Sequence, residues 1–122
     1  MSKKSMSRLH SFRHSVRGFK VVLQEPNALI HVVLAAVAIA LGVYLHISTM
    51  EWVAVVLAIS LVLGAEALNT GIEKAVDLAS PEWHATAGQA KDAAAAAVLI
   101  CSIGAAVVGA LIFLPKLAET IV

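Results

Sequence analysis

Charged residues are scarce in this sequence, at 14% of its 122 positions, whereas hydrophobic residues make up 60%. About a quarter of the residues in a soluble domain are charged, so this composition excludes an ordinary soluble protein and indicates a membrane protein. The length leaves room for one domain with three spans of about 20 residues each. The single cysteine, Cys101, excludes an internal disulfide bond.

Acidic residues are absent from the first twenty positions, which instead hold six of the nine basic residues: Lys3, Lys4, Arg8, Arg13, Arg17 and Lys20. Apolar residues recur among them at spacings of three and four: Leu9, Phe12, Val16, Phe19 and Leu23. This pattern predicts an amphipathic helix over about residues 5–24 that lies in the membrane interface. A flexible basic tail is the alternative interpretation.

Three transmembrane helices are expected, over about residues 28–47, 52–73 and 93–114. The few prolines mark their limits, since Pro26 precedes the first helix, which Asn27 can cap, and Pro115 closes the third. Ser80 ends the second helix and could cap a new turn. The polar segment 81–92 has no strong apolar period, so we expect a loop or a short helix there.

The charges also predict an orientation. With the basic N-terminus on the cytoplasmic side, the turn at 48–51 lies outside and the segment 73–92, with its two lysines, lies inside. His31, near the start of the first span, is expected to be an interfacial residue rather than a ligand. Small residues are expected to let the membrane helices approach closely: Gly64, Gly71, Gly104 and Gly109.

The second span changes character after Leu63, where polar side chains appear in what should be a continuous helix. At about 100° per residue, one face roughly 100° wide holds four of them: Glu66, Asn69, Glu73 and Asp77. An acid within a span is costly and usually marks function. The plainer explanations are a hydrogen bond between helices or a helix that leaves the membrane early.

Three carboxylates and an amide at a membrane surface suit Mg²⁺, which takes one or two carboxylates and completes its shell with water and phosphate oxygens. A lysine nearby, such as Lys91, can offset phosphate charge, and a carboxylate at membrane depth can accept the proton of a lipid hydroxyl. No GxxxxGK[ST] run occurs, which excludes a P-loop kinase, and the histidines do not have zinc spacing.

The run EALNTGIEKAVD at residues 66–77, followed by PEWH and AKDAAAAAVLI, resembles the prokaryotic integral-membrane diacylglycerol kinase family, whose signature is E-x-x-N-[ST]-x-x-E-x-x-[VI]-D. The segments EPNALIH, ISTMEWV and DLASPEWH look more like its undecaprenol kinase branch. The resemblance implies an all-α membrane protein of one kinase domain, a homotrimer in the bacterial inner membrane. Its implied reaction transfers the γ-phosphoryl group of ATP to a lipid alcohol, with undecaprenol preferred and diacylglycerol as the alternative.

The resemblance also implies residue roles. Glu66 matches the general base and Asn69 the polar residue beside it, while Asp77 closes the signature in a supporting role. Glu25 and Glu73 match the carboxylates that hold Mg²⁺ on the ATP phosphates. The implied nucleotide contacts are Arg8, His14, Glu82, Trp83, His84, Gly88, Lys91 and Asp92.

Two other functional classes stay open. A small oligomeric proton-coupled transporter would use Glu66 to couple proton movement, but it predicts an isolated acid in mid-span rather than four polar residues in register. A structural or pore-forming membrane protein predicts no ordered nucleotide contacts. The favoured partners are ATP, a lipid alcohol, the bilayer and further copies of the chain, with no nucleic acid.

Overall fold

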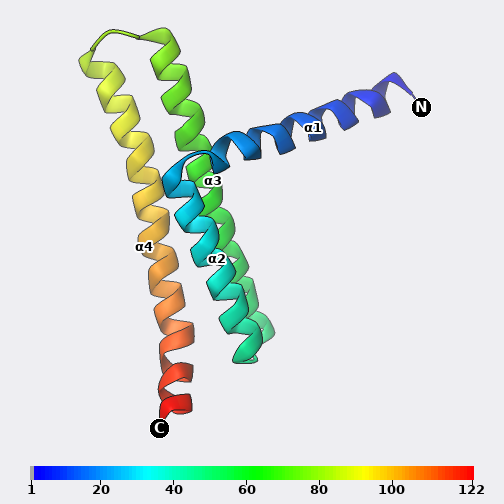
Figure 1. Ribbon diagram of the computed structural model, residues 1–122, viewed down its shortest axis with the longest axis vertical. Helices are drawn as coiled ribbons and strands as arrows, with labels where there is room; N and C mark the ends of the chain where they lie inside the picture. Colours follow the sequence, from blue (N-terminus) through cyan, green and yellow to red (C-terminus); the bar gives the residue numbers. More distant parts are fainter. Residues whose placement is uncertain (1) are drawn as a thin grey trace.

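Four α-helices make up the computed structural model, which describes residues 2–122: α1 (Lys3–Leu23), α2 (Pro26–Tyr44), α3 (Thr49–Ala79) and α4 (Ala85–Ile121). Helices α2, α3 and α4 run alongside one another, and α1 projects sideways from them (Figure 1). The last three helices are each long and apolar enough to cross a membrane. The predicted all-α architecture with three candidate spans is therefore confirmed.

Helix α1 covers the segment expected to be amphipathic. Its apolar side chains stay exposed along most of its length, including Phe12 at 71%, and only Val22 near its C-terminal end is buried. The helix leaves the bundle crosswise (Figure 1). A crosswise helix with an exposed apolar stripe and a basic face has the features of an interfacial helix.

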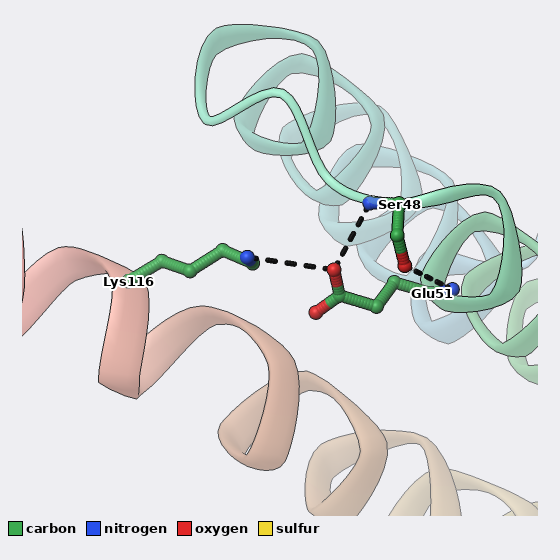
Figure 2. Close-up of polar contacts among 3 residues, drawn as sticks. All are labelled: Ser48, Glu51 and Lys116. Carbon is green, nitrogen blue, oxygen red and sulfur yellow. Dashed lines mark hydrogen bonds and ion pairs between the residues drawn. The ribbon is translucent and has the colours of Figure 1, made fainter.

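The turn between α2 and α3 is closed by a capping box, which starts α3 at Thr49 rather than at the expected residue 52. Ser48 Oγ accepts a hydrogen bond from the Glu51 N–H at 3.2 Å, and Glu51 Oε1 accepts one from the Ser48 N–H at 2.9 Å. The same carboxylate lies 3.4 Å from Lys116 Nζ of α4 (Figure 2). The box satisfies backbone N–H groups that a helix start would otherwise leave unpaired, and the ion pair links the turn to α4.

The expectation that Pro115 closes the last helix is wrong, because α4 continues through it to Ile121. A proline inside a helix removes one backbone hydrogen bond and crowds the preceding turn. In this protein, the helical turn after Pro115 is stabilised by contacts with residues outside α4. Lys116 pairs with Glu51, and Leu117 packs against a buried cluster. That cluster consists of Ile47, Val55, Ile112 and Phe113.

The connection between α3 and α4 is shorter than the polar segment 81–92 suggested. Helix α4 already begins at Ala85, where His84 Nδ1 accepts a hydrogen bond from the Thr86 N–H at 3.1 Å. Ser80 caps the C-terminal end of α3 and does not open a new helical turn. The two longest helices therefore form a hairpin with a brief non-helical tip (Figure 1).

A tight contact between α2 and α3 lies at Gly42. A Cβ atom added there would lie 2.7 Å from Cη2 of Trp52 and 3.0 Å from Cδ1 of Ile47. The glycines expected at helix contacts behave differently. Within residues 2–122, a Cβ added at Gly64, Gly71 or Gly104 would meet no atom outside its own local helix within 4 Å, and one at Gly109 would come no closer than 3.9 Å to Phe113.

Substituting Gly42 by alanine should therefore destabilise the detergent-solubilised protein by about 1–3 kcal/mol, because the Trp52 ring must move to admit the methyl group. Thermal unfolding followed by tryptophan fluorescence measures the effect. Gly104→Ala is the matched control, since its methyl group meets no such neighbour in the described chain. Equal unfolding midpoints for the two variants would contradict a tight contact at Gly42.

Candidate active site

The polar face of the second span lies on one continuous helix, α3, and changes steadily in burial. Glu66 is 3% exposed. Asn69 and Glu73 are half-buried, and Asp77 is exposed near the end of the helix. Because residues three and four apart share a helix face, these side chains form a path from the buried interior to the open end of the α3–α4 hairpin.

The carboxylate of Glu66 has one ion-pair partner within residues 2–122, the imidazole of His31 on α2. Glu66 Oε1 lies 3.2 Å from His31 Nε2, and the two side chains are 4% and 20% exposed. The sequence predicts His31 as an interfacial residue and does not predict this pairing with Glu66. A lone histidine in an apolar helix was the available signal, but its partner depends on how α2 packs against α3.

Asn69, one turn after Glu66, has a buried side-chain oxygen with an unmet hydrogen bond. Its Oδ1 atom finds no donor anywhere in the part of the chain that the structure describes. A buried acceptor left this way costs about 1–3 kcal/mol, so such an atom calls for an explanation. A donor group bound next to Glu66 would supply the missing hydrogen bond.

At the open end of the hairpin, Asp77 forms an ion pair with Lys91 of α4. Glu73, one turn earlier on α3, also attracts Lys91 electrostatically. The Asp77 side chain is 64% exposed and that of Lys91 is 39% exposed. Because water screens an ion pair as exposed as this one, Lys91 can turn from Asp77 to a phosphate group at little cost.

The two carboxylates implied for Mg²⁺ sit on different helices. Glu25, not Asn27, is the N-cap residue of α2, and its side chain makes no capping hydrogen bond. Glu73 is half-buried on α3. Among residues 2–122, no group of three His, Cys, Asp or Glu side chains could hold a metal ion. Since Mg²⁺ needs only one or two carboxylates when phosphate and water complete its shell, this donor set suits a metal that arrives with a nucleotide.

The expected nucleotide contacts fall into two groups, which lie apart within a single copy of the chain. One group lies in the α3–α4 connection and the first turns of α4: Glu82, Trp83, His84, Gly88, Lys91 and Asp92. The other group, Arg8 and His14, is exposed on α1. Over residues 2–122, the backbone of α1 approaches α2 and α3 but not α4. The structure therefore brings Lys91 to Asp77, but it does not bring Arg8 or His14 to Lys91.

Comparison with known proteins gives consistent matches. A sequence model described as prokaryotic diacylglycerol kinase matches residues 13–113. The chain is 39% identical to the undecaprenol kinase of Bacillus subtilis over 88% of each protein. It is 34% identical to a diacylglycerol kinase of Synechocystis over 93% of this chain and 66% of the relative. It is 32% identical to a diacylglycerol kinase of Haemophilus influenzae over 86% of this chain and 92% of the relative.

Proposed function

Because the chain belongs to the prokaryotic diacylglycerol kinase family, we propose that it is an ATP- and Mg²⁺-dependent kinase that phosphorylates the hydroxyl group of a membrane lipid. The observation that carries this proposal is the division of the polar face of α3. Glu66 is buried within the apolar part of α3, where the proposed lipid hydroxyl would have to reach it, while Glu73 and Asp77 lie with Lys91 at the open end.

In the proposed reaction, the lipid hydroxyl oxygen attacks the γ-phosphorus of ATP and the bond to the ADP oxygen breaks in line with it. Glu66 accepts the hydroxyl proton, and Asn69 Oδ1 is free to accept a hydrogen bond from a bound group beside it. Lys91 leaves Asp77 to offset phosphate charge. Mg²⁺, held with ATP by Glu25 and Glu73, would neutralise the charge on the β- and γ-phosphates.

Undecaprenol is the preferred acceptor in this proposal, and diacylglycerol is the alternative. The Bacillus subtilis relative, similar over 88% of both chains, is named undecaprenol kinase. Relatives from Synechocystis and Haemophilus influenzae are named diacylglycerol kinase. The reacting group is a hydroxyl in either case, so the proposed roles of Glu66 and Lys91 do not depend on which lipid is used.

We also propose that the protein lies in the bacterial inner membrane with its N-terminus and active site on the cytoplasmic side. Basic residues concentrate in α1, and such residues favour the cytoplasmic face. Helix α2 starts at Pro26, directly after α1, and so carries the chain away from that face. The Glu51–Lys116 ion pair then lies at the opposite end of the bundle.

A homotrimer is the proposed assembly, with active sites shared between copies of the single domain 1–122. Support comes from the separation of the two groups of nucleotide contacts, since α1 does not approach α4 within residues 2–122. If Arg8 and His14 touch the same nucleotide as Lys91, they must come from a neighbouring copy. Chemical crosslinking in detergent, read by gel mobility, tests for three copies.

The kinase proposal is tested by offering the purified protein Mg-ATP and either undecaprenol or diacylglycerol in detergent micelles. With radiolabelled ATP, we expect label in the extracted lipid and a higher kcat/KM for undecaprenol. Reactions without lipid control for simple ATP hydrolysis. Labelling of neither lipid, nor of a related lipid alcohol, across several detergents would contradict the kinase and favour the transporter class. A preference for diacylglycerol would change the acceptor alone.

A further inference from the structure

His31 on α2 pairs with Glu66 on α3, the residue proposed as the general base. We propose that His31 is a positioning residue for the phosphoryl transfer, which holds the Glu66 carboxylate where it can take the proton of the lipid hydroxyl. The contact runs from His31 Nε2 to Glu66 Oε1 at 3.2 Å. The inference rests on the proposed function, and it assigns a role to a residue outside the acidic signature of the family.

The burial of Glu66 is what makes a partner necessary. A carboxylate removed from water costs several kcal/mol unless another polar group compensates it. Glu66 is 3% exposed, and the surrounding segment of α3 also buries Val62 and Ala65. With a proton on Nε2, the imidazole attracts the carboxylate and offsets part of this cost. It also fixes which way the carboxylate points.

The chain places His31 for this contact through the start of α2. Pro26 is the first residue of the helix, and Ala28 in the first turn is fully buried, at 0% exposed. His31 follows one turn later, where α2 lies against α3. The start of α2 determines which face of the helix His31 occupies. The imidazole therefore reaches Glu66 from α2, a different helix from the one that carries Glu66.

His31 also stays open to a ligand, unlike a sealed structural ion pair. Its side chain is 20% exposed. It lines a cavity of about 320 Å³ between α2, α3 and α4, where Ser102 is the one other polar lining residue. A residue that touches both the buried base and an accessible cavity can control how the carboxylate faces an incoming hydroxyl. A misplacement of about 1 Å can cost about 100-fold in rate.

Two substitutions at His31 separate positioning from other roles. His31→Leu removes the polar partner and should lower kcat about 10- to 100-fold with little change in the KM for ATP. His31→Gln keeps an N–H donor near the place of Nε2 and should restore kcat to within about threefold of wild type. Val33→Leu, on the same helix and 55% exposed, is the matched control and should keep wild-type kcat.

The same assay can overturn the inference. Wild-type kcat in His31→Leu would remove any role for the contact, and a His31→Gln variant as slow as His31→Leu would mean that holding the carboxylate is not what His31 does. If the wild-type protein phosphorylates no lipid, the proposed function itself is contradicted. Unfolding midpoints of the variants show whether lost turnover reflects lost fold.

The pair itself is tested without turnover by NMR of ¹⁵N-labelled histidine side chains. On going from wild type to Glu66→Gln, the His31 side-chain nitrogen signals should shift, because the charge next to Nε2 disappears. His46, in the turn at the opposite end of α2, is the internal reference and should not move. Unshifted His31 signals would overturn the pairing whether or not the protein is a kinase.

Discussion

Replacing Glu66 by glutamine should reduce lipid phosphorylation about 100- to 10,000-fold, the range that a positioned general base supplies. Glutamine has nearly the shape of glutamate and can fill the same buried site, so packing is kept while the proton acceptor is lost. The measurement is kcat for lipid phosphate formation at saturating ATP. The KM for ATP should change little, since Glu66 lies away from the Lys91 end of the hairpin.

Glu119→Gln is the matched control for this prediction. It makes the same chemical change on an exposed side chain near the end of α4, and it should leave kcat unchanged. The oligomer and the unfolding midpoint of Glu66→Gln are measured in parallel, and both should match wild type. Near-normal turnover in Glu66→Gln would remove Glu66 from the base role. Loss of the oligomer would assign it a structural role instead.

Helical periodicity predicted the features that one helix determines by itself. The three- and four-residue spacing of Leu9, Phe12 and Val16 predicted α1, and the same geometry put Glu66 and Asp77 on one face of α3. Such relations follow from the 3.6-residue turn alone. No knowledge of the neighbouring helices is needed for them.

Side-chain contacts between different helices could not be predicted from the sequence. His31 and Glu66 are far apart in the chain and meet only because α2 packs against α3 at that level. The close fit of Gly42 against Trp52 has the same origin. The rule that a proline ends a helix also failed at Pro115. Beyond this residue, the ion pair of Lys116 with Glu51 helps to hold α4 in place. Residues in contact across helices carry no periodic signal in a single sequence.

Some of the predicted first and last residues of the helices were wrong for a related reason. Helix α3 continues beyond the span expected over residues 52–73 and ends at Ala79, directly before Ser80, the residue expected to end it, whereas nothing in the sequence predicted the start of α4 at Ala85. There, a histidine ring nitrogen caps the helix in place of a serine, threonine or acidic side chain. An unusual cap of this kind hides a helix start inside a polar segment.

Replacing Glu73 by glutamine should lower kcat about 100-fold at moderate Mg²⁺ concentration, because one of two proposed carboxylate ligands is lost. Within residues 2–122, no group of three His, Cys, Asp or Glu side chains could hold a metal ion, so no preformed protein cluster can replace the lost ligand. The concentration of Mg²⁺ needed for half-maximal rate should rise. Part of the lost rate should return at high Mg²⁺, where phosphate oxygens and water can hold the ion.

The Mg²⁺ titration distinguishes this loss from the one at Glu66, which no concentration of metal should restore. Glu25→Gln should shift the titration in the same direction as Glu73→Gln, because its carboxylate is free of any capping hydrogen bond and available to the ion. Glu119→Gln again serves as the control. A Glu73→Gln enzyme with a wild-type Mg²⁺ dependence would contradict the metal role and leave Glu73 as a neighbour of Lys91 alone. A shift in Glu73→Gln without one in Glu25→Gln would mean that the ion depends on α3 and the nucleotide, with no ligand from the start of α2.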